Sequence, residues 1–307
     1  MYRISFFGFR YLKLLVMMCF LSSCAVTRHT ELPKNSQQLH SLVERVVLVS
    51  IDGLSADVLK NNITPLLQFL ATHGAYSWDA RTVFPSQTVP GHASMITGCS
   101  VLHHGFLWNL WVPQIRCDRV SNIFSVAHAN GIATAAFVQS KRIKRLVRVG
   151  NQSDVDTFQY VLDTDRLVIL AKHWMRNNRR EILFLHFVGV DKAGHRYGWG
   201  SREQIAALGE IDRALSVLFA KAFVHGDART LMVITADHGG AGHNHGTLSR
   251  ADMTIPWIAY GAGIKQGYLI SESMKVYDTA PTILYALGVP MSAPIEGRVV
   301  QSIFEND

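Results

Sequence analysis

The sequence predicts an α/β fold with a mainly parallel sheet that helices cover on both faces. Two observations indicate it. Apolar segments of strand length alternate with amphipathic segments of helix length, and three of the apolar segments lead directly into an aspartate. Residues 43–307 contain no long linker, internal repeat or low-complexity tract, so we expect a single domain there with a substantial core.

The strands are predicted at 45–52, 181–191 and 230–238, where the sequence is RVVLVSID, EILFLHFVGVD and TLMVITADH. Helices are predicted at 165–179 and 202–223, where apolar residues recur every three or four positions. Fully apolar strands joined by helices form parallel sheets that are buried on both faces. Ligands bind such sheets beyond the carboxyl ends of the strands, which is where the three aspartates would lie.

The first 23 residues have the features of a secretory signal peptide. The opening is basic and free of acidic residues, and the apolar run at 14–21 is far shorter than the roughly 20 residues of a membrane-spanning helix. The tetrapeptide Leu-Ser-Ser-Cys resembles a bacterial lipobox, in which Cys24 carries the lipid. We therefore expect a lipid-anchored protein of the bacterial cell envelope, periplasmic or on the outer membrane, with residues 24–42 as a polar tether. The alternative is an ordinary signal peptide followed by a chance cysteine.

The net charge and the cysteine content limit which binding partners and which metal ligands are expected. The formal net charge is +7, and removal of the three basic residues of the signal leaves +4, so no nucleic-acid binding is expected. Beyond the signal and Cys24, the remaining cysteines are Cys99 and Cys117, which either form a disulfide or stay as two buried thiols. Their spacing does not suit a zinc-thiolate site, so a metal would need carboxylate and imidazole ligands.

Acidic and histidine side chains converge on the predicted sheet edge. Asp52, Asp191 and Asp237 follow the three predicted strands, His195 comes four residues after the second and His238 one residue after the third. Taken singly, each aspartate suits a turn, a helix cap or a solvated loop. Together, two Asp/His pairs and a third aspartate can hold two divalent cations. The segment TADHGGAGHNHG offers further histidines, although flexible polar loops also have this composition.

A candidate nucleophile lies in the segment TVFPSQTVPGHASMITG. Thr88 stands between Pro85 and Pro90, just before a helix predicted at 92–98. A hydroxyl near a helix N-terminus, where backbone N–H groups favour anions, suits attack on phosphorus. No Gly-x-Ser-x-Gly elbow surrounds Ser94, so a serine hydrolase of the α/β-hydrolase type is poorly supported. The alternative for Thr88 is a capping residue in a proline-rich loop.

Five segments occur in a characteristic order: SIDGL, FPSQTVPGHASMITG, HGFLWN, DKAGHRYG and DHGGAGHNHG. In this order they resemble the type I phosphodiesterase/nucleotide pyrophosphatase family of the alkaline phosphatase superfamily, and the similarity extends from about Val46 to DTAPTILYALGVP near the C-terminus. The resemblance implies an alkaline phosphatase-like three-layer αβα sandwich with two zinc ions in one catalytic domain at 43–307.

The resemblance also implies the ligands of each ion. One zinc would be bound by Asp52, Thr88, Asp237 and His238. The other would be bound by Asp191, His195 and His245, with His243 as the alternative third ligand. No metal is assigned to His103 or His104, which we interpret as structural.

The family reaction implies roles for three further positions. Thr88 would attack a phosphate ester and carry a phosphothreonine intermediate, and Asn109 would donate a hydrogen bond to a non-bridging phosphoryl oxygen. Lys141 lies where some relatives have a lysine near the phosphate, although a basic run such as 140–148 is usually a solvated helix face.

We therefore predict a zinc-dependent phosphodiesterase or nucleotide pyrophosphatase that acts on a small phosphate ester. Phosphomonoester and phosphonate substrates remain open. A noncatalytic, metal-binding surface lipoprotein is the alternative of another class, and the intact turn around Thr88 counts against it.

Overall fold

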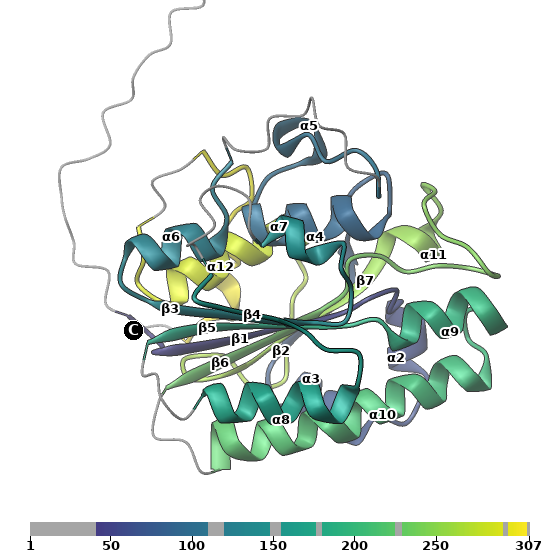
Figure 1. Cartoon of the computed structure of the whole chain (residues 1–307), viewed down its shortest axis with the longest axis horizontal. Helices are drawn as coiled ribbons and strands as arrows, with labels where there is room; N and C mark the ends of the chain where they lie inside the picture. The colour runs from purple at the N-terminus through teal and green to yellow at the C-terminus, as the bar shows by residue number, and fades with distance from the viewer. Residues whose placement is uncertain are drawn as a thin grey trace, which may run out of the picture. The chain divides into compact units, whose positions relative to one another are not determined.

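The computed structural model describes residues 41–109, 120–147, 155–175, 180–224, 229–290 and 294–305. The predicted signal peptide, Cys24 and nearly all of the predicted tether lie outside these residues. Residues 38–307 form one unit, built on an eight-stranded sheet with the strand order β4-β3-β5-β1-β6-β7-β2-β8 (Figure 1). Within the described residues, no helix combines the length and apolar composition that crossing a membrane requires.

Five of the described strands, from the edge strand β4 to β6, run parallel and form one side of the sheet, in agreement with the mainly parallel sheet that the sequence predicted. They are β1 (Arg45–Ile51), β3 (Ala133–Val138), β4 (Thr157–Tyr160), β5 (Glu181–Phe187) and β6 (Thr230–Thr235). β1 pairs in parallel with both β5 and β6, and β3 pairs in parallel with β4 and β5. Every residue of β1, β5 and β6 is buried, which explains their nearly uninterrupted apolar sequences.

The other side of the sheet is mixed. β7 (Thr254–Gly261) runs antiparallel to β6 and to β2 (Ala75–Arg81), and the short edge strand β8 (Tyr268–Leu269) is parallel to β2. The sheet is therefore mainly rather than wholly parallel.

Helices cover both faces of the sheet, which confirms the three-layer αβα sandwich (Figure 1). One face carries α4 (Thr88–Thr97), α5 (Val101–His104), α6 (Ile123–Ala129), α7 (Ile143–Leu146) and α12 (Thr279–Ala286). The opposite face carries α3 (Pro65–His73), α8 (Thr164–Trp174) and α10 (Arg202–Phe219), which continues as the π-helix η2 (Ala220–Val224).

Short helices lie at the carboxyl end of the parallel strands. They are α2 (Ala56–Lys60), α9 (Gly189–Tyr197) and α11 (Arg250–Met253). Two 3-10 turns, η3 (Val276–Asp278) and η4 (Gln301–Ile303), complete the described elements.

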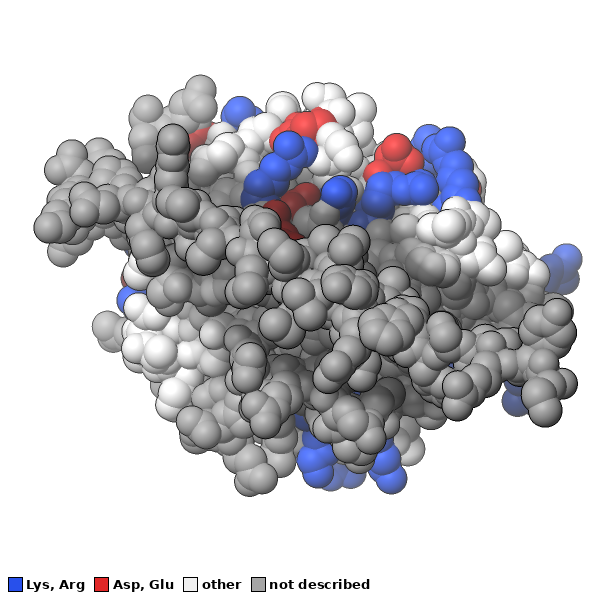
Figure 2. All heavy atoms as spheres, turned by 90° about the horizontal axis from the view of Figure 1, so that it is seen from above, with Lys and Arg blue, Asp and Glu red and all other residues white. Residues whose placement is uncertain are grey.

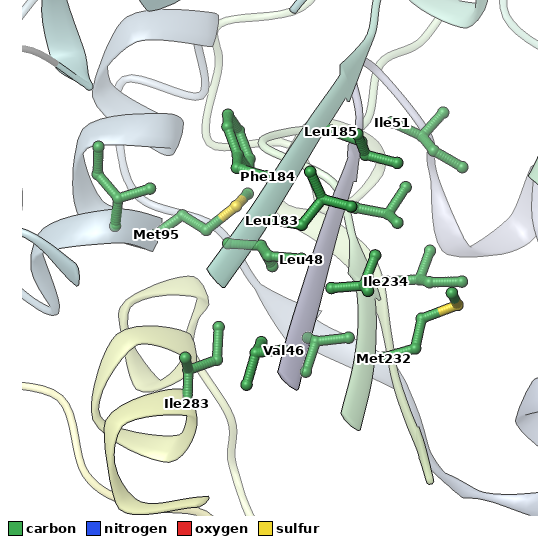
Figure 3. Close-up of a cluster of buried hydrophobic side chains, with 14 of the residues drawn as sticks. Val46, Leu48, Ile51, Met95, Leu183, Phe184, Leu185, Met232, Ile234 and Ile283 are labelled. Carbon is green, nitrogen blue, oxygen red and sulfur yellow. The ribbon is translucent and has the colours of Figure 1, made fainter. Parts of the chain in front are cut away.

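The core fills both spaces between sheet and helices. Figure 3 shows Leu48 of β1 on the side of Met95 of α4 and Ile283 of α12, whereas Met232 and Ile234 of β6 point to the opposite face. All five side chains are at most 1% exposed. Burying a side chain of this kind contributes about 1.5–3 kcal/mol, so the central strands form a rigid base for the residues that follow them.

Two predicted boundaries were wrong. α4 begins at Thr88 rather than at residue 92, because Pro90 is the third residue of the helix, where a backbone N–H has no partner within the helix anyway. β5 ends at Phe187, so Asp191 lies in the first turn of α9 and not at the end of the strand.

Candidate active site

The predicted site residues come together at the carboxyl edge of the parallel strands. Asp52 directly follows β1, and Asp237 and His238 follow β6. Asp191 and His195 lie one turn apart on α9, which places both on one face of that helix. Thr88 is the first residue of α4, and His245 lies in the loop between β6 and α11.

Asp52, Asp237 and His238 form the first ligand group. The Nε2 atom of His238 lies 3.4 Å from Oδ1 of Asp52 and 3.3 Å from Oδ2 of Asp237. All three side chains are buried, and their potential ligand atoms lie within 4.8 Å of one another. We call these three residues the inner group.

A second group of potential ligands lies around Asp191. The ligand atoms of Asp191, His238 and His245 lie within 4.8 Å of one another, and His195 approaches the same carboxylate. Nε2 of His195 lies 3.4 Å, and Nε2 of His245 3.7 Å, from the same Oδ1 atom of Asp191. The ring of His245 stacks on that of His238, with centroids 3.6 Å apart, so the two positions are neighbours. We call Asp191, His195 and His245 the outer group.

His245, and not His243, faces Asp191. The His245 side chain is 8% exposed, and its Nδ1 donates to the carbonyl of Ser86 at 2.8 Å. His243 is exposed, and its Nδ1 bonds the carbonyl of His195 at 3.1 Å. Of the two alternatives left open by the sequence, the geometry favours His245.

Backbone carbonyls fix the rings of all three histidines in the two groups. Nδ1 of His195 bonds the carbonyl of His243 at 2.9 Å, and Nδ1 of His238 bonds that of Gly239 at 2.8 Å, in the manner of His245. Because a carbonyl only accepts, each Nδ1 carries the proton and each Nε2 keeps a free lone pair. This is the tautomer that binds a metal through Nε2.

Several buried atoms of the two groups lack a hydrogen-bond partner. Among the described residues these include Oδ1 of Asp52, Oδ1 of Asp191, Oδ2 of Asp237 and Nε2 of His238. Leaving one such atom unsatisfied costs about 1–3 kcal/mol, and more when it is charged. A divalent cation would accept these lone pairs, and oxygen with imidazole nitrogen is a donor set that suits zinc. The residues therefore fit the predicted metal ions.

The charges of the inner group also favour a bound cation. Burial, reinforced by the negative charges of Asp237 and Asp191, raises the pKa of Asp52 well above its usual range. Burial alone would also raise the pKa of Asp237, but His238 and His92 hold it well below its usual range. Buried carboxylates in mutual repulsion are stabilised by a cation.

Thr88 and Asn109 meet at the N-terminus of α4. Thr88 is 3% exposed. The N–H of Val89, the next residue of α4, donates to Oδ1 of Asn109 at 2.9 Å, and the N–H of Asn109 donates to Oε1 of Gln87 at 3.3 Å. These bonds hold Asn109 against Gln87 and Val89, the two neighbours of Thr88, and its NH₂ group is the part of the side chain that can donate.

Two glycines allow the segments to approach. Gly53 has a φ of +73°, its N–H donates to Oδ1 of Asp237 at 3.1 Å, and a Cβ there would lie 3.0 Å from Cα of Asp191. A Cβ on Gly91 would lie 2.4 Å from the carbonyl oxygen of Asp237. Both glycines are needed where α4, α9 and the strand ends meet.

The sequence of the chain is similar to a known protein family. A sequence profile of the type I phosphodiesterase/nucleotide pyrophosphatase family matches residues 46–252. The chain belongs to this family. The match contains every predicted ligand as well as Thr88 and Asn109.

The curated relatives that this chain matches have low sequence identity to it and are longer. A human bis(5'-adenosyl)-triphosphatase is 27% identical over 244 residues, which cover 73% of this chain and 54% of the relative. A GPI ethanolamine phosphate transferase 2 of Schizosaccharomyces pombe is 25% identical over 359 residues, which cover 99% of this chain and 44% of the relative. The chain thus spans about half the length of these relatives.

Solved structures share the fold. A murine ectonucleotide pyrophosphatase/phosphodiesterase 5 has a TM-score of 0.73 at 16% identity, covering 85% of this chain and all of that one. A phosphonate monoester hydrolase from Silicibacter pomeroyi has a TM-score of 0.65 at 17% identity, covering 83% and 75%. These likenesses confirm the alkaline phosphatase-like architecture.

Trp199 is a site residue of this family member that the sequence interpretation missed. Its Nε1 donates to the carbonyl of Gly53 at 2.9 Å, and its ring lies 5.3 Å from that of His195. A Cβ on Gly194 would come within 2.8 Å of the Trp199 side chain, and one on Gly240 within 2.3 Å. The ring therefore fixes the outer group to the segment that follows Asp52. The only sequence signal was the two glycines, whose purpose is visible only in three dimensions.

His92 and His186 were also missed. Both are fully buried, and they contact Asp237 and Asp52 respectively. His92 follows Thr88 by four residues in α4, and His186 interrupts the apolar sequence of β5. A polar residue inside the apolar sequence of β5 was the available signal for His186.

The first two basic residues of the basic run, Lys141 and Arg142, are both exposed. The ammonium of Lys141 lies 5.5 Å from the centre of the Tyr160 ring, and its contact with substrate stays a prediction. The positive charge of Arg142 lowers the pKa of Asp52 against the larger effects of burial and of the two neighbouring aspartates. Near the top of Figure 2, described Lys and Arg side chains lie beside Asp and Glu side chains.

The remaining predicted residues have structural contacts. Nε2 of His104 lies 2.8 Å from the hydroxyl of Ser94, and Nδ1 of His103 lies 3.6 Å from Glu296. Cys99 is a buried free thiol, whereas Cys117 lies outside the described residues.

Proposed function

We propose that the protein cleaves phosphoric esters with Thr88 as nucleophile, two zinc ions as cofactors and a covalent phosphothreonine intermediate. The observation that carries the proposal is that Thr88, buried at the N-terminus of α4, is joined through His92 to Asp237 of a buried cluster of carboxylates and imidazoles. Membership of the phosphodiesterase/pyrophosphatase family supports the reaction class.

The ligand assignment follows the two groups. The inner group together with the hydroxyl of Thr88 would hold one ion, and the outer group would hold the other. Bound zinc supplies positive charge that favours the alkoxide form of a hydroxyl and neutralises phosphoryl oxygens.

The chain itself orients the reactants. The Thr88 oxygen forms a bond to phosphorus as the bond between phosphorus and the leaving oxygen breaks. The hydroxyl of Thr88 gives up its proton, and the leaving oxygen takes up a proton. The NH₂ group of Asn109, whose oxygen is held by the N–H of Val89, donates to a non-bridging oxygen whose charge grows in the transition state. Attack by water then breaks the bond between phosphorus and Thr88, and the hydroxyl of Thr88 regains its proton.

The acceptor in the second step distinguishes hydrolysis from transfer. Curated relatives of similar identity include a triphosphatase and an ethanolamine phosphate transferase by name. In the proposed mechanism, the phosphoryl group on Thr88 would pass to water in a hydrolase and to an alcohol in a transferase. Turnover of a p-nitrophenyl diester with and without an excess of an acceptor alcohol such as glycerol, followed by analysis of the products, separates the two. We expect hydrolysis; a dominant glycerol ester would show a transferase.

The ester class is tested by a substrate panel. One solved relative is an inactive threonine-to-alanine variant of the murine enzyme in complex with AMP, and another is a phosphonate monoester hydrolase. We expect the zinc-loaded protein to prefer p-nitrophenyl diesters over the monoester and over phosphonate monoesters. If none of these is turned over, a noncatalytic metal-binding protein is the better interpretation.

We further propose that Cys24 anchors the protein in the bacterial cell envelope. The lipobox and the polar tether in the sequence support this. Multiple acyl chains on one cysteine hold a protein firmly on a membrane, so Cys24→Ser should move it out of the membrane fraction or block signal processing. Cys19→Ser is the matched control and should change neither. Unchanged partitioning of Cys24→Ser would contradict the anchor.

A further inference from the structure

We propose that His186 and His92 are positioning residues, which hold the carboxylates of Asp52 and Asp237 in the orientation that binds the inner metal ion. The inference rests on the proposed function only in that the inner group binds a cation. Both histidines are fully buried, come from different layers of the fold and lie outside the predicted ligand set.

His186 fixes which oxygen of Asp52 faces the inner group. β5 and β1 are paired so that His186 stands opposite Ser50, two residues before Asp52. Nε2 of His186 lies 3.1 Å from Oδ2 of Asp52, and since a carboxylate only accepts, Nε2 carries the proton. The other oxygen, Oδ1, has no hydrogen-bond partner among the described residues and lies 3.4 Å from Nε2 of His238. The bond from His186 therefore presents Oδ1 to the ion.

His92 joins the nucleophile to the other carboxylate. Its Nδ1 lies 2.7 Å from the carbonyl oxygen of Thr88 and 3.3 Å from Oδ2 of Asp237. Both are acceptors, so Nδ1 carries the proton, and Nε2 is left to accept the hydroxyl of Ser50 at 2.8 Å. The N–H of His92 thus donates to the backbone of the residue that attacks phosphorus, and the same ring lies beside Oδ2 of Asp237, which has no hydrogen-bond partner among the described residues.

The two histidines form one buried unit. Their rings lie 4.9 Å apart in an edge-to-face arrangement, with Ser50 bonded to His92 and paired with His186 across the strands. Asp237 is also held from its other side, where Oδ1 accepts the N–H of Gly53. The carboxylates of the inner group are therefore oriented before an ion arrives. Residues that orient metal ligands in this way typically change metal affinity by about 10–100-fold when they are replaced.

Paired substitutions distinguish positioning from packing. His186→Met and His92→Leu fill similar space without a donor, whereas His186→Gln and His92→Asn retain an N–H near the original atom. We expect the two apolar variants of the full chain to bind the inner zinc ion about 10–100-fold more weakly in chelator competition. The outer zinc ion should be retained. The Gln and Asn variants should recover most of that affinity. His92→Leu should also lower kcat with little change in KM, because it alone contacts Thr88.

Three results separate the possible failures. Two zinc ions bound with wild-type affinity in both apolar variants would overturn the positioning role alone. An equal loss in the apolar and the donor-retaining variants would assign both histidines to packing. Absence of zinc from the wild-type protein would overturn the proposed function itself. Should an apolar variant not fold, Ser50→Ala, which removes only the hydroxyl on His92, is expected to weaken the inner zinc several-fold, and unchanged affinity would overturn the role of His92.

Discussion

The inner and outer ligand groups are built from different parts of the fold. The inner carboxylates directly follow two central strands, and their side chains are at most 2% exposed. The outer group comes from a helix and a glycine-rich loop, and its His195 side chain is 43% exposed. The inner site is thus an extension of the core, whereas the outer site is assembled at the surface around Trp199 and backbone carbonyls.

This difference assigns different tasks to the two positions. An unneutralised charge in the buried inner group is costly, so the proposed ion would be held there most firmly. The outer group is open to solvent through His195. We expect the outer ion to exchange faster than the inner one.

The largest expected effect that tests this contrast comes from the outer histidine. His245→Ala should lose one of two zinc ions, the one that exchanges faster, and reduce kcat/KM by at least about 100-fold, or ~3 kcal/mol in the barrier. His243→Ala is the matched control, because that side chain is exposed and its Nδ1 bonds the carbonyl of His195. Elemental analysis and chelator-release kinetics report the ions. Loss of zinc from His243→Ala with retention in His245→Ala would reverse the assignment.

A smaller effect is expected from the basic residue whose charge acts on the inner group. Arg142→Ala should raise KM by up to about tenfold with a smaller change in kcat, because it removes a positive charge whose field reaches the inner group and would attract an anionic substrate. Lys141→Ala should stay within about twofold of wild type, because its ammonium faces Tyr160. Steady-state kinetics with one diester decides between them, and equal effects would remove the distinction that we draw.

The smallest expected effect isolates the scaffold behind α4 from both metal positions. Burial lowers the pKa of His104 from 6.5 to about 4, and the N–H of Phe106 donates to its Nδ1 at 3.0 Å, so the folded protein keeps the ring neutral. The unfolded chain takes up a proton below its pKa of 6.5, so the free energy of unfolding should fall as pH drops from about 6.5 to about 4, by up to about 3 kcal/mol.

Urea unfolding of the metal-free protein at several pH values checks this contribution. His104→Gln should flatten the pH dependence in that window. His103→Gln, the same substitution at the neighbouring and 33% exposed side chain, is the matched control. The same slope in His104→Gln as in wild type would contradict the buried neutral ring.

The sequence predicted the parts of the fold that depend on local composition. β1, β5 and β6 were found because strands buried on both faces must be apolar throughout. The antiparallel β7 and β2 were not found, since their pairing joins segments that are far apart in the chain. Thr88 was placed before α4 instead of in it, because Pro90 looked like a barrier to a helix although its position in the first turn is tolerated.

The site was predicted where motifs carry it and missed where geometry does. The aspartates and histidines of both groups stand in recognisable segments such as DKAGH and DHGG. Trp199, His92 and His186 act through contacts with residues up to 146 positions away, which no local pattern reveals. Arg142 could not be separated from Lys141 by sequence, since adjacent residues of a basic run differ only in the direction of their side chains.

Trapping of the intermediate tests the central role of Thr88 most directly. During turnover of a diester, acid quenching and peptide mass analysis should find a phosphomonoester on the peptide that contains Thr88. Thr88→Ser should form the same adduct and keep much of the activity, whereas Thr88→Ala should form none and lose several orders of magnitude in kcat/KM. Absence of the adduct from wild type, together with inversion at a chiral phosphorus centre and near-normal turnover by Thr88→Ala, would contradict the account.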